Sequence, residues 1–293
     1  MSGAISDRVK LANGVEMPLV GFGSVYVEEA RKIIHAIELG YRNIDTAADY
    51  GNEAVVGEAV RSCGLARSEL FVTTKLWNSS HGYEKTLKAF DESLKTMQLD
   101  YVDLYLIHWP CPEHNLYVDT WRAMEKLYRE GRVRAIGVSN FYEEWLDRIE
   151  AECEIVPMVN QMELNPYTQK KQLRAYCAKK QIQMEAYTPL ARGMVNDDAV
   201  IQAIAERHGK NCVQVTLRFL MQEGIVVIPR TNNPERMKSN IDLYDFVLDE
   251  SEMEQMRQLD RCEILTGEDP RTFHELKNLK DQTDTKEAQR RSN

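Results

Sequence analysis

The sequence predicts an α/β protein of the (β/α)8 TIM barrel class, with an N-terminal β-hairpin that plugs one end of the barrel. Three observations support this prediction. Eight short apolar runs are typical of buried strands, helical patterns separate them, and titratable side chains end three of the runs. In a closed parallel barrel the carboxyl ends of the strands meet at one rim, where such folds do their chemistry.

The strands follow a hairpin expected within 9–17, where Asn13 and Gly14 would supply the positive φ angles of a tight turn. Each expected strand is short and rich in apolar or β-branched residues. The eight strands are expected at 19–23, 42–45, 71–75, 104–108, 135–139, 158–161, 183–187 and 226–229.

Apolar residues between these runs recur at spacings of three and four, as on the buried face of a helix. In 28–40, Ile33, Ile34 and Ile37 follow this spacing, and Gly40 is suited to end the helix. Further helices are expected at 83–97, 117–129, 198–208, 213–222 and near 250–259.

The chain has 293 residues, 43% apolar content and a net charge of −9. This length suits one barrel domain over 1–270, followed by a charged tail over 271–293 whose end, 281–293, is expected to be disordered. The acidic balance lacks the basic patch that phosphate-backbone binding requires, so we expect no nucleic-acid partner.

We expect neither a membrane partner nor a secretory signal. No window approaches 18 consecutive apolar residues, and residues 1–7 have no apolar core. Six widely spaced cysteines indicate free thiols in a reducing cytoplasm, and their spacing predicts no metal site. Cys111 is notable because it follows His108 by three residues.

Asp45, Lys75 and His108 each end an expected strand, and Tyr50 lies on the loop after the first of them. A lysine ammonium beside a tyrosine lowers the pKa of the phenol, and a carboxylate holds the lysine charged. With a histidine that can bond a carbonyl oxygen, these groups form a proton donor for a carbonyl that is becoming an alkoxide. The site supplies no electrons, so it predicts a nicotinamide hydride donor. A buried ion pair and a core histidine are the structural alternatives.

Sequence motifs in order along nearly the whole chain, about 8–265, resemble those of the aldo-keto reductase superfamily, most closely its short-loop microbial and protozoan members. That subgroup includes diketogluconate reductases and reductases similar to prostaglandin F synthase. The motifs are GFGS at 21–24, DTAADYGNE at 45–53, TKLW at 74–77, DLYLIHWP at 103–110, GVSNF at 137–141, NQME at 160–163, YTPLARG at 187–193, and IPR at 228–230 with the segment through residue 240.

The resemblance implies an NADPH-dependent carbonyl reductase in which Tyr50 is the acid and Lys75 tunes it. Asp45 would anchor Lys75, and His108 would orient the substrate carbonyl. We expect a monomer that acts on small-molecule aldehydes, α-dicarbonyls or ketones. Trp77 and Trp109 would form walls of the substrate site, and in this family the C-terminal loop, here 267–276, often borders the substrate. The short loop after Trp109 would leave the site open to varied substrates.

The resemblance also implies the cofactor contacts. Tyr187 would stack on the nicotinamide, and Arg230 and Arg236 would suit the 2′-phosphate, because guanidinium groups match phosphate geometry. The nicotinamide carboxamide would be held by Ser139, Asn140 and Gln161. The remaining contacts would come from Gly23, Ser24, Thr188, Leu190, Thr231, Asn232 and Asn240.

Five positions depart from the usual family pattern. Arg230 stands for a lysine and Thr231 for a serine, which keeps the charge and the hydroxyl. Ser239 replaces an acidic or amide residue that contacts adenine, and Asn165 replaces a frequent histidine. Val25 replaces an aromatic residue, so the substrate pocket would be roomier.

Two other classes of function remain open at this point. Some members of the superfamily bind NADPH chiefly to regulate channels, and such a redox sensor would have a complete site with little turnover. A lyase would instead use Lys75 as a Schiff-base nucleophile, which needs a neutral amine, and Asp45 disfavours that state.

Overall fold

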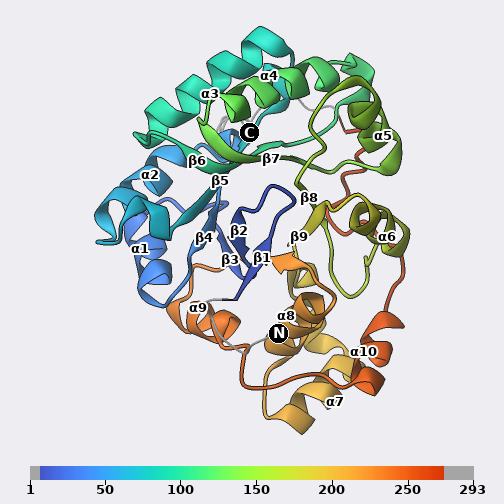
Figure 1. Cartoon of the computed structure of the whole chain (residues 1–293). Helices are drawn as coiled ribbons and strands as arrows, with labels where there is room; N and C mark the ends of the chain where they lie inside the picture. Colours follow the sequence, from blue (N-terminus) through green and yellow to red (C-terminus); the bar gives the residue numbers. More distant parts are fainter. Residues whose placement is uncertain (1–6, 274–293) are drawn as a thin grey trace, which may run out of the picture.

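A computed structural model describes residues 7–273 and forms the (β/α)8 barrel that the sequence predicts (Figure 1). The strands are all parallel and lie in chain order, and a bridge between Val20 and Val227 joins the two ends of the sheet. They are β3 (Gly21–Gly23), β4 (Asn43–Asp45), β5 (Phe71–Leu76), β6 (Val102–Ile107), β7 (Val133–Ser139), β8 (Val159–Glu163), β9 (Gln183–Tyr187) and β10 (Val226–Val227). The predicted disorder of 281–293 lies outside the described residues, as does most of the tail.

The strand boundaries differ from the predicted ones where local chemistry decides them. Lys75 is one residue before the end of β5, and His108 is the first residue after β6. β10 has only two residues instead of the predicted four. Pro229 has no backbone N–H to donate to a neighbouring strand, which suits an early end.

The N-terminal hairpin consists of β1 (Arg8–Lys10) and β2 (Glu16–Pro18), which pair antiparallel over the centre of the barrel (Figure 1). The predicted two-residue turn is wrong. Gly14 has a φ of +87°, but Asn13 is not in the left-handed region. The amide of Gly14 donates to the carbonyl of Leu11, and Leu11 pairs with Val15, so the loop has the three-residue form of hairpin.

Helices surround the strands, and four of them lie where we named no helix, although a helical crossover is general to this fold. The predicted α-helices are α1 (Ala30–Glu38), α3 (Tyr83–Met97), α4 (Tyr117–Arg129), α7 (Ala199–His208), α8 (Cys212–Gln222) and α10 (Glu250–Arg257). The others are α2 (Glu53–Ser62), α5 (Glu143–Glu152), α6 (Lys171–Lys179) and α9 (Pro234–Ile241). Short 3-10 helices are η1 (Ala48–Tyr50), η2 (Arg67–Glu69), η3 (Asn78–Ser80), η4 (Pro112–His114) and η5 (Ala191–Asp197). No helix of the described residues is both long enough and apolar enough to cross a membrane.

Several helices after β9 begin at side chains that cap them. Asp198 accepts hydrogen bonds from two amides of the first turn of α7. Asn211 and Asp249 form reciprocal capping boxes at the starts of α8 and α10. These caps satisfy amides that a helix cannot bond internally, so the local sequence defines where each helix starts.

Helices α2 and α3 pack closely at Gly57, which is buried. A Cβ atom at this position would lie 2.0 Å from the carbonyl oxygen of Met97, the last residue of α3, and 2.5 Å from its Cα. The guanidinium of Arg61, one turn further along α2, donates to the same carbonyl. Glycine is therefore required for the two helices to pack at this distance.

Candidate active site

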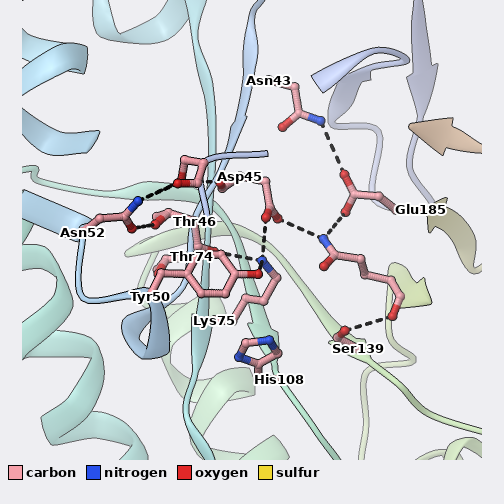
Figure 2. Close-up of polar contacts among 12 residues, drawn as sticks. Asn43, Asp45, Thr46, Tyr50, Asn52, Thr74, Lys75, His108, Ser139 and Glu185 are labelled. Atoms are coloured by element: carbon pink, nitrogen blue, oxygen red, sulfur yellow. Dashed lines mark hydrogen bonds and ion pairs between the residues drawn. The ribbon is translucent and has the colours of Figure 1, made fainter. Parts of the chain in front are cut away.

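Four predicted residues meet at the carboxyl end of the barrel (Figure 2). Asp45 ends β4, Lys75 lies near the end of β5, and His108 follows β6. Tyr50 ends η1, a turn in the loop after β4, and its ring centroid lies 5.8 Å from that of His108. The barrel thus brings together the side chains that the sequence places at separate strand ends.

Lys75 is fully buried and has three oxygen partners. Its Nζ donates to Asp45 Oδ1 at 2.6 Å, to the carbonyl of Thr46 at 2.9 Å, and to the hydroxyl of Tyr50 at 3.4 Å. Burial by itself would lower the pKa of Lys75, but Asp45 and Tyr50 raise it above its ordinary value. The lysine therefore remains a charged ammonium beside the phenol.

Tyr50 keeps its proton in this structure. Burial raises the pKa of Tyr50 to about 12, even though the nearby Lys75 ammonium lowers it. The lowering of the pKa by Lys75 that the sequence predicts is present, but the loss of solvation on burial outweighs it. The phenol is consequently protonated, and able to donate its proton, throughout the neutral pH range.

His108 is a neutral imidazole. Burial, followed by the positive charge of Lys75, holds the pKa of His108 well below its usual range. Its Nδ1 is buried without a hydrogen-bond partner among the described residues. A neutral ring carries one N–H, so a proton on Nε2 enables it to donate to a carbonyl oxygen.

A polar network lies beside the Lys75–Asp45 pair. Gln161 on β8 donates from Nε2 to Asp45 Oδ2 at 2.9 Å and to Glu185 Oε2 on β9 at 2.8 Å. Figure 2 shows Glu185 also facing Asn43, whose amide nitrogen lies 3.5 Å from Glu185 Oε1. We did not predict Glu185, although an acid inside an apolar strand such as 183–187 is a signal that could have been used.

The site opens into a cavity of about 960 Å³. Asp45, Tyr50 and His108 contribute to its wall. The other predicted residues that line it are Gly23, Val25, Trp77, Trp109, Asn140, Gln161, Tyr187, Thr188, Leu190, Arg230, Thr231, Arg236 and Asn240. The barrel therefore gathers most of the predicted cofactor and substrate residues around one space.

Four predicted site residues are not part of the cavity wall. Lys75 is buried behind it. Ser24 and Ser139 donate their hydroxyl protons to backbone carbonyls on neighbouring strands, at 2.7 and 2.9 Å respectively. Asn232 is exposed on the loop before α9. The hydroxyl of Ser139 thus donates to the backbone of Gln161 and does not reach the cavity, whereas Gln161 lines it.

Three aromatic rings lie together in the wall of the cavity. The ring centroids of Trp109 and Phe273 lie 4.2 Å apart, and those of Trp77 and Phe273 lie 6.4 Å apart. Trp77 also packs edge-on against His108, at 5.2 Å. Cys111 is buried behind the tryptophans, and burial raises its pKa to about 12, so it is not a reactive thiolate.

The segment that carries Phe273 is tied to the end of β8. Glu163, which is buried, accepts hydrogen bonds from the amides of Leu265 and Thr266 and from the hydroxyl of Thr266. Thr266, Glu268 and Phe273 line the cavity. The part of the predicted segment 267–276 that the structure describes therefore borders the cavity, and its contact with a substrate stays a prediction.

The other end of the cavity lies between β3 and β10. Arg230 donates to the carbonyl of Val25 at 3.2 Å, and its guanidinium lies over the ring of Tyr26 at 5.3 Å. Arg236 on α9 is exposed and lines the cavity. We did not predict Tyr26, because its pairing with Arg230 depends on the closure of the barrel.

Two of the unusual positions acquire a structural role. Ser239 lines the cavity and accepts a hydrogen bond from Asn211 at 2.8 Å. Asn165 is buried, and its Oδ1 accepts from the amide of Tyr167 at 3.0 Å. Asn165 thereby shapes the turn that follows β8.

The fold and the site define a parallel-barrel protein with a buried Tyr–Lys–Asp–His group beside a long cavity. A family model for the aldo/keto reductase family matches residues 19–261. The chain belongs to this family.

Individual relatives agree with this assignment. The chain is 48% identical over 267 residues to the glyoxal reductase of Bacillus subtilis, covering 90% of this chain and 96% of the relative. It is 43% identical over 271 residues to the methylglyoxal reductase DkgA of Escherichia coli, covering 90% and 97%. A solved structure of a Gox0644 mutant in complex with NADPH is 40% identical, with a TM-score of 0.86 and coverage of 91% and 98%.

Proposed function

We propose that the protein is an NADPH-dependent carbonyl reductase that converts aldehydes, α-dicarbonyls or ketones to alcohols. The observation that carries this proposal is the Tyr50 hydroxyl, which contacts the Lys75 ammonium and faces the same cavity as His108. The proposal also places one barrel domain over 1–270, in a reducing compartment such as the cytoplasm, where the six free cysteines would stay reduced.

The residues around the cavity fit NADPH. Gly23 lines the cavity, and an added Cβ at this position would lie 3.1 Å from the carbonyl of Ile228. The backbone at Gly23 therefore faces the cavity without a side chain, so a cofactor can approach it closely. Both hydrogens of Gln161 Nε2 are donated to the carboxyl groups of Asp45 and Glu185, which leaves its Oε1 to accept from a carboxamide. Arg230 and Arg236 at the other end provide donors for a phosphate. When bound, NADPH supplies the hydride that the protein lacks.

The side chains supply the proton and the polarisation. His108 donates a hydrogen bond to the carbonyl oxygen of the substrate and holds it near the Tyr50 hydroxyl. As the oxygen gains charge, Tyr50 transfers its phenolic proton to it, and the Lys75 ammonium stabilises the phenolate that remains. Asp45 keeps Lys75 in place and charged. Trp77, Trp109 and Phe273 shield one side of the site from water.

Small dicarbonyl compounds are the substrates we favour within this class. The similar proteins include one named glyoxal reductase and one named methylglyoxal reductase. Trp77, Trp109 and Phe273 provide apolar contact, and Tyr50 and His108, whose rings contact each other beside Trp77, suit a carbonyl oxygen. These properties suit a compact, uncharged substrate.

The lyase alternative is not favoured, because Lys75 is buried and charged and a Schiff base requires a neutral amine. The sensor alternative is not favoured either, because the named relatives are reductases. Turnover separates a reductase from a sensor. We expect glyoxal or methylglyoxal to oxidise NADPH with a kcat within the usual range of enzymes, about 1–10³ s⁻¹. Tight NADPH binding without turnover on a panel of aldehydes, dicarbonyls and ketoses would instead support a sensor.

Arg236→Ala is expected to reduce the preference for NADPH over NADH by at least about tenfold, because a hydrogen bond to a charged group contributes roughly 1.5–3 kcal/mol. Arg236 should dominate, since Arg230 is already engaged with Val25 and Tyr26. The measurement is the Kd of each cofactor for both proteins. Lys238→Ala, on the same helix but outside the cavity wall, is the matched control and should leave the preference unchanged. Equal affinities in the unmodified protein would contradict this assignment.

A further inference from the structure

Glu185 is a fully buried acid with no assigned role in the proposed mechanism. It lies on β9, two residues before Tyr187, with no solvent exposure. Its Oε2 accepts from Gln161 at 2.8 Å, and its Oε1 lies 3.5 Å from the amide nitrogen of Asn43. Through Gln161, which lines the cavity, Glu185 is one hydrogen bond away from the space where the nicotinamide would lie.

The charges around Glu185 do not balance when it is ionised. Asp45 from β4 and Lys75 from β5 are the charged groups whose fields act on it, and Lys75 already pairs with Asp45 at 2.6 Å. Among the described residues, no cation forms an ion pair with Glu185. Burial and then the charge of Asp45 raise the pKa of Glu185 to about 8, which favours the neutral acid.

Asn43 is consistent with a protonated Glu185. Its Oδ1 is buried without a hydrogen-bond partner, and its Nδ2 makes only a long contact to Glu185 Oε1. If the amide is turned over, a proton on Glu185 Oε1 can be donated to Asn43 Oδ1. That arrangement gives the proton of Glu185 an acceptor at Oε1, whereas an ionised Glu185 has only the long contact from the asparagine amide to stabilise charge at this oxygen.

We infer that Glu185 is a positioning residue whose proton is linked to the redox state of the cofactor. The neutral acid favours the reduced nicotinamide, and the carboxylate favours the oxidised one. This inference rests on the proposed function, because it requires nicotinamide beside Gln161. The physical reason is charge: the oxidised ring carries one positive charge that the reduced ring lacks, and an anion in the buried network attracts it.

The sign of the linkage follows from this attraction. Binding of NADP⁺ lowers the pKa of Glu185, so the acid releases a proton to solvent as NADP⁺ binds, whereas NADPH binding does not cause this release. The affinity for NADP⁺ relative to NADPH therefore rises as the pH increases through the range in which free Glu185 ionises, and it levels off once Glu185 is ionised in every state.

The test is the ratio of the Kd values for NADPH and NADP⁺, measured by quenching of tryptophan fluorescence from pH 6 to pH 9.5. The 2′-phosphate is common to both cofactors, so its titration cancels in the ratio. We expect the ratio to rise on the order of tenfold in the unmodified protein, for charges several ångströms apart in a partly screened interior. In Glu185→Gln, which keeps the shape without a titrating proton, the ratio should stay constant.

Two further measurements distinguish the alternatives. Tyr50→Phe should retain the pH dependence, and its loss there would assign the effect to Tyr50 and overturn the inference. Calorimetry in buffers of different ionisation enthalpy should show proton release when NADP⁺ binds near pH 7.5. This measurement uses the unmodified protein, so it does not depend on whether a variant folds. If both cofactors bind with a constant ratio, only the inference fails. If neither binds, the proposed function fails as well.

Discussion

Tyr50→Phe is expected to reduce kcat for carbonyl reduction by at least ~10²-fold, the lower end of what general acid catalysis contributes. The substitution removes the phenolic proton and keeps the ring, which packs edge-on against His108. Lys75 cannot replace the donor, because Asp45 and the Thr46 carbonyl hold its Nζ. NADPH binding should be retained, so single-turnover reduction with bound NADPH is the decisive measurement.

A matched control is available in the same cavity. Tyr26→Phe also removes one phenolic hydroxyl from the cavity wall. Tyr26 has no role in the proposed proton transfer, and its contact with Arg230 is through the ring, which phenylalanine keeps. This variant should keep kcat within about threefold of the unmodified protein, since it affects no proton transfer. Turnover in Tyr50→Phe close to that of the control would remove Tyr50 from the mechanism.

Gly57→Ala is expected to give the largest loss of stability from a single added methyl group. The new Cβ would overlap the backbone of Met97, which cannot rotate away as a side chain can, so α2 and α3 must separate. Overpacking of this kind costs about 1–3 kcal/mol or more, which exceeds the ~1 kcal/mol that alanine gains over glycine in a helix. For a net cost of about 2–3 kcal/mol, we expect Tm to fall by roughly 3–5 °C in a chain of this length.

The control for this variant is Glu58→Ala, the next residue along α2, which is exposed. It also introduces alanine into the same helix and should change Tm by no more than about 2 °C. Thermal unfolding followed by circular dichroism compares the two. A Gly57→Ala protein as stable as the control would mean that the two helices separate at little cost.

Position along the chain was enough to predict which side chains meet at the rim of the barrel. Asp45, Lys75 and His108 end buried runs, and a parallel barrel brings such ends together whatever their separation in sequence. The net pKa shift of Tyr50 was not predictable, because it depends on the solvent that the folded walls exclude. The pairing of Glu185 with Gln161 was also missed, since it requires the register between β8 and β9.

Turn geometry and loop placement were predicted less well, for a related reason. The Asn13-Gly14 pair signals a hairpin, but the strands on either side determine how many residues the turn contains. Phe273 could be placed near the substrate only by family resemblance, because the hydrogen bonds that tie its segment to Glu163 span about a hundred residues of sequence.

The barrel closes between β3 and β10 through a short strand pairing. β10 has two residues, and the contact with β3 consists of one bridge, Val20 to Val227, and a hydrogen bond from the amide of Gly23 to the carbonyl of Pro229. Transient opening of the native state occurs where it costs the least free energy, so we expect the barrel to open locally between β3 and β10. Arg230 and Val25 face each other across the same gap, beside the proposed cofactor cavity. A cofactor bound there would stabilise the contact between β3 and β10, so we expect bound cofactor to slow proteolysis of the native protein.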